Sequence, residues 1–276
     1  GAVRRGRFYA AALKIGLTPA TILRDKPKTY PGAGRGWSPA NYEGVYHGTT
    51  TMRQALALSL NAATLDLAER VGVYRIRETA RACGITSPLQ DNLGLALGAS
   101  EVGLLELVAA YAPFAHAGFL PKPRLVSAVV DSDGIVLETT PAEAASALNA
   151  ETAYLMTNLL ESVTQHGTAR GLKTMGVTFP AAGKTGTTND GRDAWFVGYT
   201  SSLLAGVWVG DDLNRSLKLT GAKDALPLWA AFMAQAAADR PGEPFARPEG
   251  VVEFVICGES GMLARSGCPR KRAEIF

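Results

Sequence analysis

The feature that most constrains the fold is the stretch 181–199, which predicts a β-hairpin. Small and β-branched residues run over 182–188, turn-forming residues occupy 189–192, and an aromatic and apolar run covers 194–199. Two strand-like runs joined by a short turn are typical of a hairpin. We expect the rest of the chain to be organised around it.

The first strand of this hairpin carries one cation among hydroxyl groups. Lys184 is followed by Gly186 and flanked by Thr185, Thr187 and Thr188. The missing side chain at Gly186 allows close approach to the strand backbone, and an ammonium group with hydroxyls suits an anion, most simply a carboxylate. We therefore predict that a substrate binds along this strand. The alternative is an ordinary exposed strand.

A nucleotide-binding phosphate loop is a third interpretation of the Gly-Lys-Thr tripeptide. That loop requires a glycine five positions before Gly183, and Thr178 stands there. The backbone cradle for phosphate is therefore missing, which argues against nucleotide binding.

Composition and charge exclude several other classes of function. With 47% apolar and 19% charged residues, the 276-residue chain can bury a large core as one domain or two lobes. The net charge of +3 is small and its cations are mostly scattered, so no nucleic acid partner is implied. No apolar run is long enough to span a bilayer and no signal peptide precedes the fold. Because the chain lacks a starting Met, we expect a piece of a longer protein whose anchoring segment lies outside it.

Cysteine and histidine spacing gives no sign of a metal or a cofactor. No Cys-x-x-Cys or His-x-x-x-His pattern occurs, and the three histidines are far apart, so we expect neither. Cys83 falls in a helical pattern and is expected to be a buried thiol. Cys257 and Cys268 are close enough in sequence to form a bridge in an oxidising compartment.

Periodicity along the chain predicts a helical body followed by antiparallel strands. Apolar spacing and capping residues predict helices at 8–15, 51–58, 64–71, 75–83, 104–115, 151–165 and 227–239. Thr51 and the segment 100–102 are expected to cap two of them. Strands are expected at 125–130 paired with 135–138, at 203–209 and at 251–256, and 25–48 is expected to be loop. This order favours an α+β fold in which an antiparallel sheet packs against helices.

The pair Ser59 and Asn61 places a hydroxyl and a carboxamide two residues apart at a helix end. Alone, the pair indicates ordinary helix-terminus chemistry. A Ser-x-Asn element combined with Lys-Thr-Gly, and with a Ser-x-x-Lys nucleophile motif, characterises penicillin-binding proteins and serine β-lactamases. The hypothesis requires Ser59 and Asn61 to face Lys184 across a shared cleft.

Further segments extend the resemblance over almost the whole chain. In order, the chain resembles the transpeptidase domain of class A, bifunctional penicillin-binding proteins at 37–42, 98–102, 110–112, 167–169, 195–199, 207–212 and 260–264. The resemblance implies a β-lactamase/DD-peptidase-like fold over 1–240, with an all-helical lobe mainly at 50–170 and a sheet mainly at 172–240 that packs with the N-terminal helix. Residues 241–276 would begin a truncated C-terminal extension.

The same resemblance implies acyl transfer on peptidoglycan stem peptides, with β-lactams as substrate mimics. A serine attacks the D-Ala-D-Ala carbonyl, and an amine of a neighbouring stem resolves the acyl-enzyme. Carried onto this chain, Ser59 would relay protons, Asn61 would orient the substrate, and Lys184 would supply positive potential. Thr185 and Thr187 would hold the substrate carboxylate, the backbone N–H of Thr187 would form half of the oxyanion hole, and Gly186 and Thr188 would complete the strand.

The nucleophile motif itself does not match. Counting back from Tyr9, Ala2 stands where the serine belongs and Arg5 where the lysine belongs, and no other Ser-x-x-Lys occurs. Alanine cannot attack, and an arginine with a pKa above about 12 cannot act as the base. An inactive relative, a replacement and a shifted reading frame before Phe8 are three explanations.

Two other functions remain as alternatives. A non-catalytic module could keep the groove and only bind stems or a partner. A carboxypeptidase or β-lactamase of the same fold is disfavoured by the segment at Trp37 and the extended tail. The resemblance also implies an extracytoplasmic protein whose parent chain carries a membrane anchor and a glycosyltransferase domain.

Overall fold

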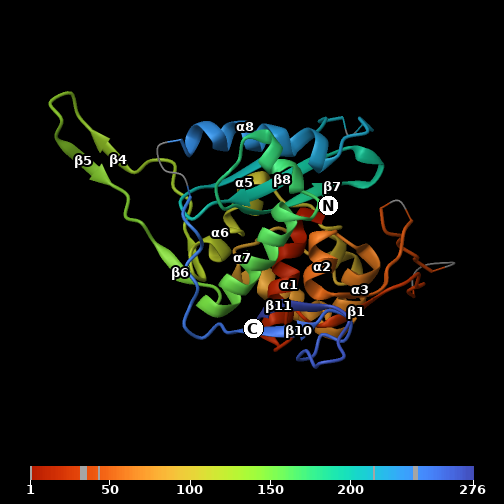
Figure 1. The fold of residues 1–276 in the computed structure, drawn as a ribbon. Helices are drawn as coiled ribbons and strands as arrows, with labels where there is room; N and C mark the ends of the chain where they lie inside the picture. The colour runs from red at the N-terminus through yellow and green to blue at the C-terminus, as the bar shows by residue number, and fades with distance from the viewer. Residues whose placement is uncertain (1, 32–35, 43, 214, 239–241) are drawn as a thin grey trace.

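The computed structural model describes residues 2–31, 36–42, 44–213, 215–238 and 242–276. Helices form the body of the molecule, and a three-stranded antiparallel sheet lies beside them with a further helix on its outer face (Figure 1). The predicted α+β fold, an antiparallel sheet packed with helices, is confirmed.

The helical elements of the described residues alternate with short strands. The helices are η1 (Ala2–Arg4), α1 (Arg5–Lys14), α2 (Met52–Ala57), α3 (Asn61–Val71), α4 (Val73–Ala82), η2 (Leu93–Leu97), α5 (Leu104–Ala109), α6 (Ala112–Ala115), α7 (Ala150–Gln165), η3 (Arg170–Met175), η4 (Asn189–Gly191), the π-helical η5 (Gly221–Ala225) and α8 (Leu226–Ala236). The strands are β1 (Ile22–Asp25), β2 (Gly48–Thr51), β3 (Phe119–Pro121), β4 (Ala128–Val130), β5 (Val136–Thr139), β6 (Ala144–Ser146), β7 (Ala182–Thr187), β8 (Ala194–Tyr199), β9 (Leu204–Val209), β10 (Glu253–Cys257) and β11 (Lys271–Ile275).

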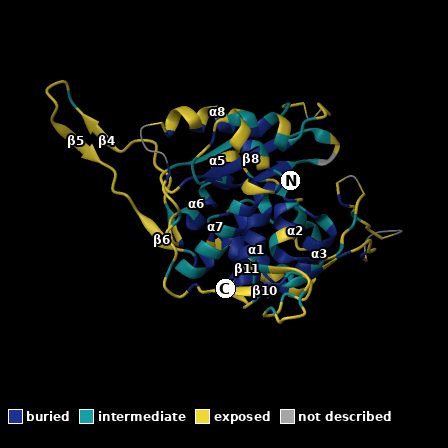
Figure 2. Ribbon diagram, in the orientation of Figure 1, coloured by how far each residue is buried: buried dark blue, intermediate teal, exposed yellow. Residues whose placement is uncertain are grey.

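Helix α1 runs through the centre of the helical body and is buried along nearly its whole length. Its run of alanines, Ala10 to Ala12, allows α4 and α7 to pack closely against it. The helix begins three residues before the predicted start at Phe8, so Arg5 and Arg7 are buried with it. Figure 2 shows this buried centre in dark blue.

The predicted hairpin 181–199 is confirmed as β7 and β8, with β9 added as the third strand. In its register Lys184 lies opposite Val197, and Thr185 lies opposite Phe196. Alternation along a strand therefore puts Lys184 and Thr185 on opposite faces of the sheet. Helix α8 covers the Phe196 face, because the Trp229 ring packs against Phe196 with 5.0 Å between centroids. The Lys184 face is turned toward the helical body.

Most of the predicted helices are confirmed, with ends that shift by a few residues. Thr51 caps α2 as expected, because its hydroxyl accepts a hydrogen bond from the Gln54 N–H at 3.3 Å. The predicted end of the last helix, Asp239, lies outside the described residues. Among the described helices, none combines the length and apolar character needed to cross a membrane.

The predicted helix 104–115 and its cap are wrong. The segment forms two short helices, α5 and α6, and Pro113 stands in the first turn of α6, where it has no N–H to donate. The residue before α5 is Gly103, and the Ser100 hydroxyl instead accepts a hydrogen bond from the Gln90 N–H at 3.0 Å. The apolar periodicity of the sequence continues through 104–115, but the helical conformation of the backbone is interrupted between α5 and α6.

One strand pair was not predicted and another was predicted only in part, since their partners are distant or weakly patterned. Strand β1 pairs with β2 across a long excursion, so both ends of the predicted loop 25–48 are strand residues. Strand β11 pairs with β10, and only β10 had been expected. The region 50–170 is mostly helical but also contains β3 to β6, so it is not all-helical.

The second predicted hairpin is confirmed as β4 and β5, and it projects from the body (Figure 1). Every residue of both strands is exposed, which Figure 2 shows as a yellow arm. Strands β3 and β6 pair at its base.

Candidate active site

The turn between α2 and α3 presents the first two predicted site residues. Helix α2 ends at Ala57 and α3 begins at Asn61, three residues before the predicted start. Ser59 lies between the two helices with a φ of 59°, a left-handed conformation that costs energy for a residue with a side chain. The sharp turn places Ser59 outside regular helix and Asn61 at the first position of α3.

Strand β7 brings Lys184 to this turn. The Lys184 Nζ donates to Ser59 Oγ at 3.0 Å and to the backbone oxygen of Thr185 at 3.3 Å. Lys184 has no exposed surface. The structure thus brings together two groups that lie more than a hundred residues apart in sequence.

Burial controls the protonation of Lys184. Loss of solvent, and then the nearby charge of Arg5, lower the pKa of Lys184 well below its ordinary value. The neutral amine is therefore favoured more strongly here than on an exposed lysine. A lysine in this state can accept a proton as well as supply positive potential.

Arg5 fills the space between Ser59 and Asn61. Its guanidinium donates to the Ser59 backbone oxygen at 2.8 Å and to Ser59 Oγ at 3.2 Å, and it also donates to Asn61 Oδ1. The Asn61 Nδ2 donates in turn to the Ala40 backbone oxygen at 2.5 Å. Burial lowers the pKa of Arg5 to about 10, so the group stays protonated at neutral pH.

Two cations therefore share one hydroxyl oxygen. Because Lys184 and Arg5 both donate to Ser59 Oγ, its lone pairs are occupied and its own proton is available to a third group. This arrangement suits a hydroxyl that passes a proton onward.

The threonines of β7 have partners of their own. Thr185 Oγ1 lies 2.6 Å from Thr168 Oγ1, and Thr187 Oγ1 accepts a hydrogen bond from the Gly221 N–H at 3.1 Å. Thr188 is placed at the hairpin turn, where its hydroxyl accepts from the Asp193 N–H at 2.8 Å. The predicted residues thus follow one strand, with Thr188 at its far end.

Gly186 does allow a close approach, and the segment that approaches is the start of the chain. A Cβ at Gly186 would lie 2.9 Å from both the Cβ and the backbone nitrogen of Val3. Element η1 therefore packs directly on β7, which places Ala2 beside the predicted substrate strand.

The comparisons with known proteins identify the family. The description "Penicillin binding protein transpeptidase domain" matches residues 8–214, and "Penicillin-binding protein 1A, C-terminal domain" matches residues 247–276. The chain belongs to the penicillin-binding protein transpeptidase family. The family match begins at Phe8, which is also where the family pattern resumes in the sequence.

Relatives of this transpeptidase domain are penicillin-binding proteins 1A. That of Neisseria gonorrhoeae is 35% identical over 96% of this chain, and that of Aquifex aeolicus is 36% identical over 95%. In both cases the alignment covers 36% of the relative, so the chain spans about a third of the length of these proteins.

Solved structures have the same fold. Penicillin-binding protein 1A from Haemophilus influenzae matches 100% of this chain and 47% of its own, with a TM-score of 0.93 and 27% identity. PonA1 from Mycobacterium tuberculosis matches 90% of this chain and 71% of its own, with a TM-score of 0.78 and 26% identity. A second PonA1 structure, in complex with penicillin V, has a TM-score of 0.79 and 25% identity.

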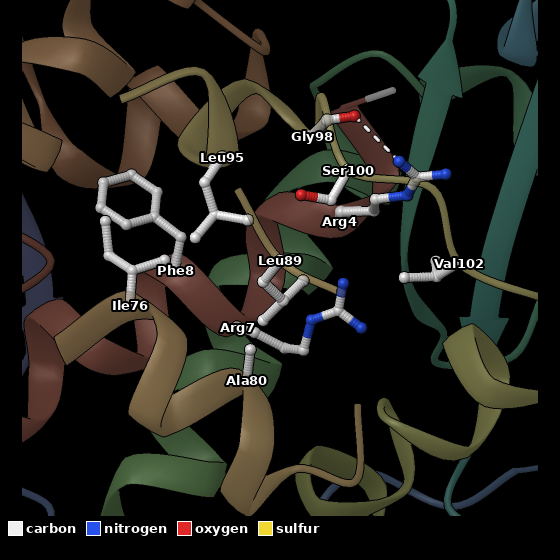
Figure 3. Close-up of a pocket in the computed structure, with 10 residues that line it drawn as sticks. All are labelled: Arg4, Arg7, Phe8, Ile76, Ala80, Leu89, Leu95, Gly98, Ser100 and Val102. Atoms are coloured by element: carbon white, nitrogen blue, oxygen red, sulfur yellow. Dashed lines mark hydrogen bonds between the residues drawn. The ribbon is translucent and has the colours of Figure 1, made fainter. Parts of the chain in front are cut away.

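Arginines that precede Phe8 are buried in the core of this transpeptidase domain. Arg7 is 4% exposed, its Nη1 has no hydrogen-bond partner, and burial lowers its pKa. It lies beside a small pocket with Ile76, Ala80 and Leu95, and with Arg4, which donates to the Gly98 backbone oxygen (Figure 3). Within the described residues, no ion pair includes these arginines.

Two contributors to the candidate site were not predicted as site residues. Thr168 touches Thr185, and its backbone N–H donates to the Ala57 backbone oxygen at 3.0 Å. Gly167 is pressed against the same turn of α2, since a Cβ there would lie 2.3 Å from the Ala57 oxygen. The segment 167–169 carried a signal, because it was among the segments that resembled the family.

The described residues contain no group of three or more His, Cys, Asp or Glu side chains placed to hold a metal ion. Cys83, Cys257 and Cys268 are free thiols in the structure.

Proposed function

We propose that this chain has the fold and site of a peptidoglycan D,D-transpeptidase domain, which cross-links stem peptides by serine acyl transfer. The reaction requires a serine at position 2 and a lysine at position 5. With Ala2 and Arg5 the chain has neither the nucleophile nor the base, and it forms no acyl-enzyme. The contact of Lys184 Nζ with Ser59 Oγ, in a chain of this family, is the observation that carries the proposal.

The positions of Ala2 and Arg5 support the interpretation that they replace the serine and the lysine of the nucleophile motif. Element η1 packs on β7, so a hydroxyl at position 2 would stand beside the strand that holds the substrate. Arg5 already reaches Ser59 and Asn61, and the shorter lysine at this position would point its amine the same way. Such a lysine, desolvated like Lys184, could take the proton from a serine at position 2.

The remaining steps use residues of this chain. Ser59, with its oxygen held by two cations, passes the proton to the leaving amine of the terminal D-Ala. Thr185 and Thr187 hold the substrate carboxylate at the edge of β7, Lys184 supplies positive potential from the other face of the strand, and the Thr187 backbone N–H stabilises the oxyanion. Asn61 holds the substrate amide once the arginine is replaced.

Restoration of the motif tests the proposal. A fluorescent penicillin should not label the chain covalently, whereas A2S/R5K should be labelled, and K184A in the A2S/R5K background should lose at least a hundredfold in labelling rate. The single variants A2S and R5K are matched controls and should label weakly or not at all. A folded A2S/R5K protein that stays unlabelled, or covalent labelling of the original chain, would refute the assignment of the motif.

The coding DNA upstream of Phe8 provides an independent test of the cause. A Ser-x-x-Lys motif in another reading frame would explain the first residues as a frame shift. Its absence from all three frames would leave a natural or deliberate replacement.

A second function is favoured by the Arg5 network. Because Arg5, Ser59 and Asn61 satisfy one another without a nucleophile, the chain could serve as a non-catalytic module that binds peptidoglycan stems. Calorimetric titration with a stem peptide ending in D-Ala-D-Ala should then give reversible binding that K184A removes. Absence of heat with the original chain excludes this function and leaves the transpeptidase proposal intact.

The partners and the cellular location are proposed by analogy with the relatives. We propose stem peptides as partners, β-lactams as ligands, and an extracytoplasmic location in a parent with a membrane anchor and a glycosyltransferase domain. The division into 1–240 and 241–276 also remains a proposal, and its boundary lies outside the described residues.

A further inference from the structure

The C-terminal hairpin is closed by a loop that folds back on its own strands. Strands β10 and β11 pair antiparallel, and the Gly258 N–H continues the ladder by donating to the Arg270 oxygen at 2.7 Å. The Cys257 N–H donates to the Met262 oxygen at 2.8 Å, which holds the loop against the end of β10. The mouth of this loop is therefore fixed by backbone hydrogen bonds.

Two cysteines lie at the mouth of the loop. Cys257 ends β10 opposite Lys271, and Cys268 stands three residues before Lys271, so the ladder brings both cysteines to the same end of the hairpin. The backbone of Cys268 is fixed as well, because its N–H donates to the Arg265 oxygen at 3.1 Å. The third thiol, Cys83, is fully buried in the main core.

We propose that Cys257 and Cys268 form an intramolecular disulfide that closes this loop in an oxidising compartment. Paired cysteines that staple a short loop are typical of proteins outside the cytosol. The proposal does not depend on the nucleophile, on Arg5 or on acyl transfer.

The chemistry requires an oxidised disulfide donor such as glutathione disulfide. The Cys257 thiolate, whose pKa is the lower of the two, attacks one donor sulfur and releases the first donor thiolate. Cys268 then loses its proton, and its thiolate attacks Cys257 Sγ and releases the second donor thiolate. Two protein thiols are oxidised, the donor is reduced to two thiols, and the two protein protons pass to them.

Cys257 is suited to the first step. The Cys268 thiol, and then the Ser260 and Glu259 backbone, lower the pKa of Cys257 to about 7, whereas burial raises the pKa of Cys268. At neutral pH Cys257 is therefore the better nucleophile of the pair.

The disulfide would also fasten a segment that holds the active-site helix. Strand β11 carries Glu274, which is 2% exposed and accepts hydrogen bonds from Arg53 of α2. Arg53 also donates to the Asn158 oxygen and to Ser162 Oγ on α7. Helix α2 leads directly to Ser59, so order in the C-terminal hairpin supports order in that turn.

Thiol counting on the 276-residue chain tests the proposal. After equilibration with glutathione disulfide and denaturation, one thiol per chain should react, and after full reduction all three should. Peptide mapping should recover Cys257 linked to Cys268. Three reactive thiols after oxidation, or a disulfide that includes Cys83, would overturn the proposal.

Cysteine variants test separately whether the disulfide forms and whether it stabilises the chain. C83S should leave no reactive thiol after oxidation, because the remaining two are paired. Reduction should lower the Tm of the original chain by several degrees and leave the Tm of C257S/C268S unchanged. Equal Tm values for the oxidised and reduced forms of the original chain would show that the bond does not fasten the hairpin.

Discussion

Lys184 carries its ammonium group into a site with no exposed surface, and this makes the folded protein sensitive to pH. Its pKa is lowered in the folded state, whereas in the unfolded chain it stays near 10.5. Between those two values the unfolded chain binds more protons, so the contribution of Lys184 to stability rises with pH. As the pH falls through the lowered pKa, that contribution is lost.

We therefore predict that K184M flattens the rise of stability with pH. The free energy of unfolding of the original chain and of K184M is measured in urea between pH 7 and pH 9.5. As the pH increases, the original chain should gain stability relative to K184M. K173M, which removes an exposed lysine, is the control and should leave the slope unchanged. A constant difference between K184M and the original chain would contradict the lowered pKa.

Arg7 is a second residue whose charge is poorly accommodated. Since its buried Nη1 has no partner, replacing it by Met should stabilise the fold by about 1–3 kcal/mol. Equilibrium unfolding in urea measures this, and exposed Arg24 changed to Met should stay within about 0.5 kcal/mol. Destabilisation by R7M would mean that the guanidinium is better satisfied than its contacts indicate.

At the level of elements, the support of the Ser59 turn comes from the loop that follows α7. A Cβ at Gly167 would lie 2.3 Å from the Ala57 oxygen, so either the loop or the end of α2 must move. We predict that G167A destabilises the chain by about 1–3 kcal/mol and reduces penicillin labelling in the A2S/R5K background.

Gly103 supplies the matched control for that change. A Cβ there meets nothing within 4 Å, and its φ of −67° is accessible to alanine. G103A should therefore alter stability by only a few tenths of a kcal/mol. If G167A were equally mild in both assays, the loop would not support the turn.

Local sequence predicted those elements whose partners are near in the chain. The β7–β8 hairpin and helices such as α7 were predicted because strand runs, turn residues and apolar periodicity agree over short spans. The β1–β2 pair was not predicted, because its strands are short and a long connecting segment separates them. No local sequence pattern therefore indicates their pairing.

For the site, sequence indicated the residues but not how they connect. The pairs Ser59 with Asn61 and Lys184 with Thr185 were identified from their motifs. The bridging hydrogen bonds of Arg5 and the contact of Thr168 with Thr185 depend on how α1 and the loop after α7 pack. Side-chain directions of that kind are fixed by tertiary packing, on which a motif carries no information.

At the level of the whole molecule, one buried ion pair joins the last strand to the helical body. Arg53 is paired with Glu274, whose side chain is 1% exposed, so removing one partner leaves the other charge buried. We predict that E274A destabilises the chain by about 3–5 kcal/mol, measured by urea unfolding. Exposed Glu249 changed to Ala is the control and should have little effect. A small effect of E274A would show that the tail folds independently of the body.

The projecting β4–β5 arm has a practical consequence for experiments on this molecule. Its two ends meet where Pro121 pairs with Ala144, so the chain leaves the body and re-enters it at one place. A dye or an affinity handle inserted into the tight turn around Gly134 would therefore stand away from β7, at the far end of the projecting arm (Figure 1). Such an attachment point would allow immobilised or single-molecule binding measurements that leave the candidate site untouched.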